Sequence, residues 1–500
     1  MSDNKTAKSI TTGSLILMII TSVYGFGNVS VSYFQMGYAS IIWYIFAGIV
    51  FMIPSSLMMA EYSSAYPDAK GGIFTWLANS IGEKWAFIGT FIWLANWVIW
   101  LVSTASKIWI SFSSLLFGKD TTQSWHLGSL NSTKVVGLLA ILFILLVTFL
   151  TSRGIQGIKA MSSLGGVFLI CENFLFIIVS IWVLCLNHGQ LAQPLHGASS
   201  LLKSPNPAFQ SPLAVISFIV YAIFAYGGME TVSGVSDSME NPEKDFPRGL
   251  IFGTAFTIIS YVLSLFMAGF TVNYQHDVAR QGVNLGNMTY VIFHRLGQAL
   301  GEGLGLSAAA SDAIGAYFVR FVALAALMGL IGAFFVVIYS PIKSFILGSD
   351  ERLWPKKLVQ LNEHGIPTTA MWAQAIFVCL IIFFVAFGGS AAKGFYQILQ
   401  NMVNVSSAAS YIFIIGAFPF FIKKDPERKF RIFKNYGWTV ALVILVEAVI
   451  GAGIVFTIVE PILQGDYMSA FWTAMGPIVF GLIAYIFYKL SEDAHHFSDE

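Results

Sequence analysis

Charged residues and cysteines are scarce in this sequence. Of its 500 residues, 11% are charged and 56% are hydrophobic, whereas a soluble domain typically carries about 25% charged residues. This excludes an ordinary soluble protein, and a formal net charge of +1 gives no basis for binding nucleic acid. The three cysteines, Cys171, Cys185 and Cys379, lie in apolar runs. They are predicted to be buried small side chains rather than disulfides or metal ligands.

Motifs of catalysis are missing as well. None of the eight histidines lies in the middle of an apolar run, and no H-E-x-x-H metal motif, nucleophile motif or nucleotide-binding P-loop occurs. The sequence therefore predicts no enzymatic activity, no metal or other cofactor, and no dependence on ATP.

Long apolar runs fill most of the chain instead. A helix needs roughly 20 apolar residues to cross a bilayer, so we predict an all-α membrane protein. Its single transmembrane domain covers residues 1–490, and a short tail follows at 491–500. Twelve spans are predicted, near residues 12–35, 38–60, 86–117, 134–152, 161–187, 212–236, 248–272, 313–339, 368–389, 395–422, 438–460 and 468–490.

Lysine and arginine are distributed unequally between alternate loops. If the N-terminus is cytoplasmic, the inside loops hold most of them, including the cluster at Lys423–Lys434. The outside segments then hold only Lys119, Lys134, Lys203, Arg280, Arg295 and Lys393. Positively charged loops stay on the cytoplasmic side, so both termini are predicted to be cytoplasmic.

The sixth predicted span contains an interruption followed by an acid. The stretch Ser217–Arg248 begins as an apolar helix, breaks at Gly227-Gly228, places Glu230 just past the break and continues as a polar loop. Backbone groups freed by such a break cost several kcal/mol each in hydrocarbon unless protein, water or ligand satisfies them. The break therefore indicates a functional cavity in which the freed backbone groups find partners. The alternative is that the two glycines only allow a neighbouring helix to pack closely.

The first predicted span carries a second interruption, Gly25-Phe26-Gly27. Interrupted helices at matching positions of two halves indicate a transporter built on an inverted repeat, with its site near the midplane. The repeats would be spans one to five, about 12–187, and spans six to ten, about 212–422, with the last two spans, about 438–490, appended.

Motifs along the chain resemble a known superfamily. They are P-x-x-L-M-x-A-E at Pro54–Glu61, G-G-I-F-T-W at Gly71–Trp76, E-N-P-x-x-D-F-P-R at Glu240–Arg248, S-P-x-K-x-F at Ser340–Phe345 and H-G-I-P at His364–Pro367. Together with Y-G-G-M-E in the sixth span, they make nearly the whole chain similar to the amino acid–polyamine–organocation (APC) superfamily. The run G-G-I-F-T-W-L-A-N-S-I-G with Trp85 most resembles the bacterial glutamate:GABA antiporters, and among them the YjeM-type inner-membrane transporters.

The resemblance implies a LeuT-like five-plus-five inverted repeat and secondary transport by alternating access in the bacterial inner membrane. The implied partners are an amino acid or related amine, carried by antiport or with a proton, membrane lipid, and further copies of the chain. Only Ser491–Glu500 follow the last span, whereas acid-resistance antiporters have a longer tail, so no tail-based pH gating is carried over. A membrane-embedded sensor or enzyme on the same fold is the alternative.

An amino acid needs partners for both of its charged groups. A helix N-terminus presents free N–H groups to a carboxylate, and unwound carbonyls suit an ammonium group. We therefore expect the backbone of Gly25–Gly27 and Ala225–Gly228 to contact the substrate.

Four side chains are candidates for the wall of the site. Phe224 lies where the resembled transporters carry an aromatic gate, and Tyr226 has a hydroxyl to donate; packing is the alternative for both. Asn96 and Trp100 share one face of the third span with Trp93. Asn96 is the expected polar contact and Trp100 a wall, unless Asn96 forms a helix–helix hydrogen bond.

Ionisable residues within spans are functional candidates by default, and here they are Lys107, Glu172, Glu230, Arg320 and Glu447. Glu230 is the first candidate for a gate or coupling residue. Glu172 lies near where the resembled transporters place a cationic group, and burial disfavours a charged carboxylate, which makes it a candidate proton carrier. Lys107 and Arg320 are expected to reach the interface, and Glu447 to face lipid or a second copy. The absence of Ser and Thr from Phe321 to Tyr339 predicts transport without sodium.

Overall fold

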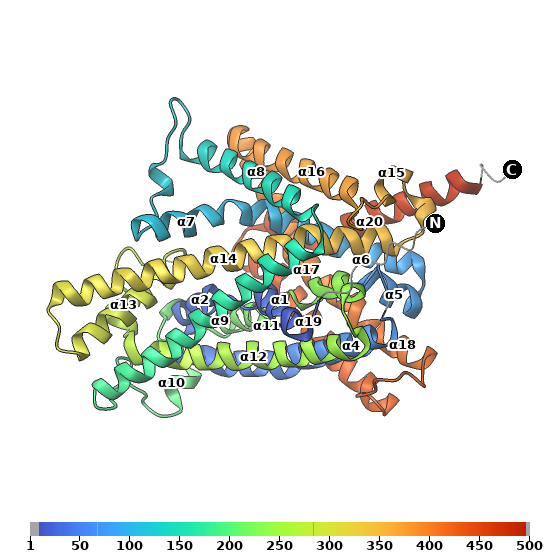
Figure 1. Ribbon diagram of the computed structural model, residues 1–500. Coiled ribbons are helices and arrows are strands. Elements are labelled where there is room, and N and C mark those ends of the chain that lie inside the picture. Colours follow the sequence, from blue (N-terminus) through green and yellow to red (C-terminus); the bar gives the residue numbers. More distant parts are fainter. Residues whose placement is uncertain (1–9, 68, 284, 497–500) are drawn as a thin grey trace.

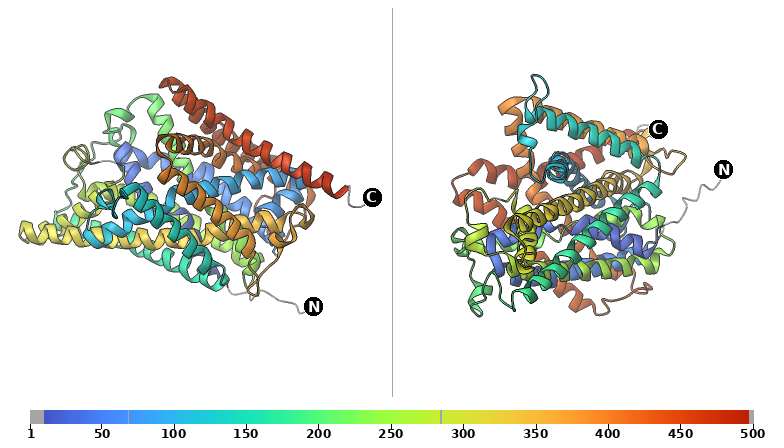
Figure 2. Two further views of the ribbon diagram at one scale, coloured as in Figure 1. Left: turned by 90° about the horizontal axis from the view of Figure 1, so that it is seen from above. Right: turned by 60° about the vertical axis from the view of Figure 1, so that its left-hand side comes forward.

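The computed structural model describes residues 10–67, 69–283 and 285–496. These residues form a bundle of helices. The described part of the chain contains no β-strand, only two isolated β-bridges. The all-α prediction is therefore confirmed. Most of the helices run roughly along one direction, and the first and last described residues lie at the same end of the bundle (Figures 1 and 2).

The helix bounds follow the predicted spans closely. In the first half they are α1 Thr12–Val23, α2 Phe26–Met36, α3 Ser40–Ala47, α4 Ile53–Ala65, α5 Ile73–Ile81, α6 Glu83–Ala105, α7 Lys107–Phe117, α8 Ser132–Thr151, α9 Ile155–Leu186 and α10 Ser199–Leu202. In the second half they are α11 Pro212–Phe224, α12 Pro242–Thr271, α13 Met288–Gly303, α14 Ala308–Gly348, α15 Lys356–Val359, α16 Thr368–Phe387, α17 Gly389–Gly416, α18 Phe418–Lys424, α19 Tyr436–Leu463 and α20 Tyr467–His496.

Eleven helical segments of the described chain are long and apolar enough to cross a membrane. The first, Thr12–Ala65, covers both of the first two predicted spans, and the others each correspond to one predicted span. Side-chain caps start several of these helices: Thr11, Asn131, Ser211 and Ser307 each accept a backbone N–H of the first turn. Such caps satisfy donors that a helix start leaves free.

Two predicted loop segments are helical. The polar loop expected before the seventh span is partly the start of α12, because Pro242 occupies its first turn, where proline loses no hydrogen bond. The eighth predicted span ends at residue 339, but α14 continues to Gly348 with Pro341 inside it. The polar residues Ser340 and Lys343 therefore belong to the helix rather than to a loop.

The cysteine prediction is wrong in part. All three cysteines are free, but Cys171 and Cys185 are exposed on α9 and Cys379 is half-buried. Their neighbours on α9 include Phe174 and Ile178, whose side chains are likewise exposed. A helix that faces lipid places apolar side chains on its outer surface, so an apolar run does not predict burial within the protein.

Candidate functional site

The chain leaves helical geometry at both glycine-rich positions. Between α1 and α2, Tyr24 and Gly25 have extended backbone angles. Past α11, residues 225–228 form turns and lead into a 3₁₀ segment, η5 (Met229–Ser238), with Gly228 at φ +116°. A Cβ on Gly228 would lie 2.5 Å from the Ser22 carbonyl oxygen. The two interruptions therefore touch, and only glycine permits this approach.

Tyr261 of α12 joins the two interruptions further. Its hydroxyl donates to the Val23 carbonyl at 2.9 Å and lies 3.4 Å from the Ala225 carbonyl. It accepts the Gly25 N–H at 3.3 Å and the Asn28 amide at 2.9 Å. One phenol thus binds groups on both sides of the first interruption and holds its backbone in place.

Two adjoining cavities lie at this junction. The Glu230 cavity, of about 370 Å³, is bounded by both interruptions and by α6, α14 and α17; its lining includes Asn96, Trp97, Trp100, Phe224, Gly227, Gly228, Glu230, Ser407 and Tyr411. The Glu172 cavity, of about 420 Å³, contains Gly25, Phe26, Gly27, Thr104, Lys107, Glu172, Thr289 and Tyr290 in its lining. Both are also lined by Ser22, Val23, Asn28, Trp100 and Ala333. Each volume lies within the range of small-molecule sites.

Glu230 is fully buried and fully engaged. Its Oε1 accepts the Trp93 indole N–H at 3.2 Å, and its Oε2 accepts the Gly228 N–H at 3.0 Å and the Tyr411 hydroxyl. An ionised carboxylate can only accept hydrogen bonds, so these three donors suit it. The carboxylate therefore ties α6, η5 and α17 together on the floor of its cavity.

Glu172 is equally buried, with 1% of its surface exposed, but its carboxyl group is unengaged. Neither oxygen has a hydrogen-bond partner among the described residues. Its neighbour Asn173 donates to the Tyr24 hydroxyl at 2.6 Å and to Ser264 at 2.9 Å, so α9 is anchored beside it. A buried charge with no partner is costly, so this acid needs a proton or a cationic ligand.

The ends of three helices present backbone groups to the cavities. The first turn of α2, Phe26–Asn28, lines the Glu172 cavity, and a helix start leaves its first N–H groups without intrahelical partners. The last residues of α1 and α11 line the Glu230 cavity. A helix N-terminus favours an anion and a helix C-terminus a cation, so the junction has complementary poles.

Most of the predicted site residues are brought together here. Gly25, Phe26 and Gly27 line the Glu172 cavity, and Asn96, Phe224, Gly227 and Gly228 line the Glu230 cavity, with Trp100 in both. Asn96 is half-buried in the wall of its cavity. Tyr226 does not join them: it is fully buried and donates to the Tyr44 carbonyl at 3.1 Å.

The remaining candidates lie in three different settings. Lys107 lines the Glu172 cavity rather than only the interface. Arg320 is half-buried beside Gly118 and donates to the Ala316 carbonyl at 3.3 Å. Glu447 is half-exposed on α19, with its Oε1 buried against Gly416 of α17 and unpartnered in the described chain. It therefore faces the bundle at least in part.

Sequence reasoning missed several members of the site. Asn28 follows the first interruption by one residue, and Tyr221 donates to its side-chain oxygen at 3.0 Å. Trp93 shares a face of α6 with Asn96, but nothing in the sequence pairs it with Glu230, and Tyr411 has no local signal. Tyr290 of α13, outside the spanning helices, also lines the Glu172 cavity, and burial raises the pKa of its hydroxyl above the usual value. It is a neutral polar group there.

Beyond Glu230, η5 is fastened to α14 through a set of contacts that we call the η5–α14 clamp: Thr231, Gly234, Asp237, Ser340 and Lys343. The Ser340 hydroxyl donates to the Thr231 carbonyl and accepts the Gly234 N–H. The Lys343 ammonium donates to the Gly234 carbonyl at 2.8 Å and to Asp237 at 2.6 Å, with only 3% of its side chain exposed. The clamp lies on the C-terminal part of α14, which runs towards the end of the bundle at which both described chain ends lie (Figure 1).

Within the described residues, no group of three or more His, Cys, Asp or Glu side chains is placed to hold a metal ion. The ionisable groups at the two cavities are instead separated: Glu230 in one, Glu172 and Lys107 in the other.

Comparison with known proteins gives an independent finding. A family model described as Amino acid permease matches residues 10–484. The Inner membrane transporter YjeM of Salmonella typhimurium is 44% identical over 97% of this chain and 96% of that protein. More distant is the Aspartate/glutamate permease AcaP of Lactococcus lactis subsp. cremoris, 24% identical over 82% and 79% of the two chains. The Glutamate/gamma-aminobutyrate antiporter of Lactococcus lactis subsp. lactis is 22% identical over 82% and 75%.

Proposed function

The chain belongs to the amino acid permease family, and on this premise we propose that it carries an amino acid or a related amine across the inner membrane by alternating access. One observation supports this most: two helix interruptions with opposite poles touch across a pair of adjoining cavities. A zwitterion needs both poles. The names of the relatives, which are transporters and permeases, give no support to an enzyme or sensor.

The proposed topology has twelve crossings arranged as a five-plus-five inverted repeat, with the first and sixth helices broken. Two observations support it. The first apolar segment has 54 residues, about twice what one crossing needs. The two described chain ends lie towards the same end of the bundle, where an even number of crossings would place them (Figure 2). The loop charges favour the cytoplasm for that end.

Cysteine labelling tests this topology. The three free cysteines, Cys171, Cys185 and Cys379, must first be replaced by serine. Single cysteines at the exposed Ser124 and Ser199 should then react with an impermeant thiol reagent outside intact cells, and one at the exposed Glu240 should not. Labelling of the last position from outside would invert the topology.

The substrate is proposed to contact the backbone of Gly25–Gly27 and of Gly227-Gly228, with Asn96, Trp100 and Phe224 as walls. A carboxylate would lie at the first turn of α2, and an ammonium group at the ends of α1 and α11. The relatives' names make acidic amino acids and γ-aminobutyrate the first substrates to try. Uptake into proteoliposomes from a panel of labelled amino acids and amines tests the proposal, with a Gly27→Val protein as the inactive control.

For coupling, Glu172 is the proposed proton carrier because its carboxyl group is buried without a partner in the described chain. Glu230 accepts hydrogen bonds from three donors, and its proposed role is instead to hold the gate of the site together. Two measurements separate the coupling modes. Faster uptake into vesicles preloaded with unlabelled substrate indicates exchange, whereas loss of uptake on adding a proton ionophore indicates proton coupling.

Sodium is not expected to take part. The first serine or threonine hydroxyl on the inner half of α14 is that of Ser340, and it is already committed to Thr231 and Gly234 in the η5–α14 clamp. Side chains of Ala, Gly, Leu and Phe offer no oxygen ligand, and backbone carbonyls within a helix are used. Replacing all sodium by choline at constant pH should leave the initial rate unchanged; a strict sodium requirement would refute this assignment.

A further inference from the structure

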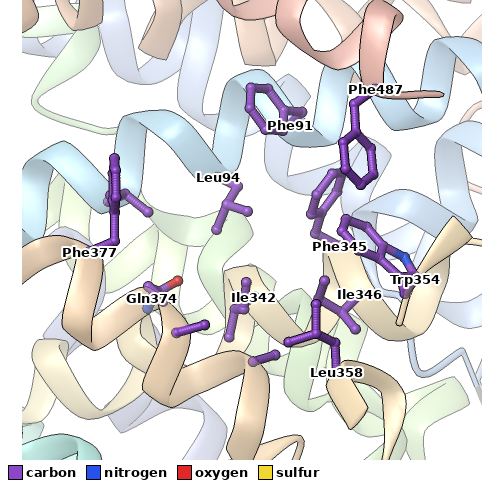
Figure 3. Close-up of a pocket in the computed structure, with 13 residues that line it drawn as sticks. Phe91, Leu94, Ile342, Phe345, Ile346, Trp354, Leu358, Gln374, Phe377 and Phe487 are labelled. Carbon is purple, nitrogen blue, oxygen red and sulfur yellow. The ribbon is translucent and has the colours of Figure 1, made fainter. Parts of the chain in front are cut away.

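An apolar pocket of about 270 Å³ lies away from both cavities, between α6, α14, α16 and α20 (Figure 3). Leu94 of α6 and Ile342 and Phe345 of α14 point into the same space. Among its lining residues in the described chain, only Gln374 carries an amide, and its nitrogen donates to the Ile338 carbonyl at 3.2 Å, which ties α16 to α14. The pocket is therefore an apolar hollow in the bundle wall.

The pocket opens sideways rather than towards the substrate cavities. Its lining residues Phe377 and Phe487 are 55% and 38% exposed, and Ala373 is also exposed. On the same outer surface of α16, Leu380 is 61% exposed. These residues belong to membrane-spanning helices, so the surface that they form faces hydrocarbon. An apolar hollow open to hydrocarbon is filled by acyl chains, since nothing else is present at that depth.

Basic residues stand at the mouth of the pocket. Lys356 and Lys357 open the short helix α15, next to Leu358, which lines the pocket. Both are exposed, and within the described chain neither makes an ion pair. The nearest other cation in the segment, Arg352, is held by Asp350 at 2.6 Å. Basic groups beside an apolar pocket between spanning helices, at the cytoplasmic surface, suit an anionic headgroup.

We propose that this pocket binds one acyl chain of an anionic glycerophospholipid, whose headgroup lies on Lys356 and Lys357. The inner wall of the pocket is the turn of α14 that carries the η5–α14 clamp: Ile342 and Ile346 face the pocket, and Ser340 and Lys343 face η5. The bound chain therefore packs against the turn of α14 that is fastened to η5. This site is separate from the proposed substrate site and does not depend on it.

Trp354 offers a direct readout, because it lines the pocket and its ring packs against Phe345 and Phe487. The full chain is reconstituted in phosphatidylcholine vesicles that contain a fraction of phosphatidylglycerol or phosphatidylcholine brominated on the acyl chains. Bromine quenches a tryptophan that it touches. The difference between wild type and Trp354→Phe isolates this one residue among the 13 tryptophans. Quenching of Trp354 by brominated phosphatidylglycerol should saturate at a mole fraction several-fold lower than for brominated phosphatidylcholine.

Two variants and their controls complete the test. Lys356→Gln/Lys357→Gln should remove the difference between the two lipids, whereas Lys423→Gln/Lys424→Gln, on α18 elsewhere at the same end (Figure 1), should not. Ala373→Phe, at the exposed mouth, should abolish saturable quenching, and Leu380→Phe, outside the pocket, should preserve it. Equal quenching by both lipids in the wild-type protein, or quenching that survives Ala373→Phe, overturns the proposal.

Discussion

The indole N–H of Trp93 donates to the Glu230 carboxylate at 3.2 Å, although 137 residues separate them in the chain. Tyr411 reaches the other oxygen of the same carboxylate from α17. One acid thus connects three helical segments at the floor of a cavity.

Removing the hydroxyl of Tyr411 tests this connection. Tyr411→Phe loses its bond to Glu230 and the one that it accepts from Gly228. A hydrogen bond to a charged group contributes about 1.5–3 kcal/mol, and one between neutral groups about 0.5–1.5 kcal/mol. We expect a lower thermal unfolding midpoint in detergent and a slower transport rate. Tyr317→Phe is the matched control, because Tyr317 is 70% exposed. An unchanged midpoint in Tyr411→Phe would contradict a structural role for the connection.

Replacing glycine should have different effects at the two interruptions: loss of substrate binding at Gly27 and loss of folding at Gly228. A Cβ on Gly27 would meet no heavy atom within 4 Å, and this residue lines the Glu172 cavity, so Gly27→Val should fold normally and lose substrate binding. At Gly228, φ is +116° and a Cβ would meet the Ser22 carbonyl at 2.5 Å, so Gly228→Val should fail to fold. Thermal unfolding with and without substrate separates the two outcomes; a Gly27→Val protein that is still stabilised by substrate would place the site elsewhere.

Glu172→Gln should separate stability from transport. The carboxyl group has no partner to lose among the described residues, so the unfolding midpoint should stay the same or rise. If Glu172 carries the proton, the initial transport rate of Glu172→Gln should lose its dependence on pH, because the glutamine amide cannot bind and release a proton. Glu240→Gln, at an exposed position, is the control. A pH profile that keeps its wild-type shape would remove Glu172 from the coupling step.

Glu61, the acid of the P-x-x-L-M-x-A-E motif, should prove structural. It is fully buried, pairs with Arg428 at 2.6 Å and accepts the backbone N–H groups of Ile432 and Phe433. Removal of one partner of a buried ion pair costs about 3–5 kcal/mol, because it leaves the other charge unpaired. Glu61→Ala should therefore lower the amount of folded protein and its unfolding midpoint. Glu61→Gln, which keeps one acceptor oxygen, should do so less; equal stability of all three proteins would contradict this role.

The positions of the helices were predictable because a bilayer imposes a length on each apolar run. The helix ends could not be predicted where polar residues remain helical. Ser340 and Lys343 resemble loop residues in the sequence, yet η5 provides hydrogen-bond partners for their polar groups. A hydropathy pattern contains no information about partners that are distant in the sequence. The same limit explains the cysteines, since hydropathy does not distinguish a side that faces lipid from one that faces protein.

The interruptions at Gly25–Gly27 and Gly227-Gly228 could be predicted because the glycines of each lie within three residues of one another in the sequence. Tyr411 could not, since its partner Glu230 is 181 residues away and tyrosines are common in this chain. Glu172 and Glu230 also look alike in sequence: each is a single acid within an apolar run. They differ only in the hydrogen-bond donors around them: among the described residues Glu230 has three, and Glu172 has none.

Glu230 and Thr231 are neighbours in the chain, and this adjacency has a consequence for signalling within the molecule. The first faces the cavity and the carbonyl of the second receives Ser340 in the η5–α14 clamp. We therefore expect a ligand that displaces the Glu230 carboxylate to disturb the clamp through the backbone of η5, without a relay of side chains across the bundle. Substitutions at Glu230 and at Ser340 should consequently have effects on the free energy of unfolding that do not add.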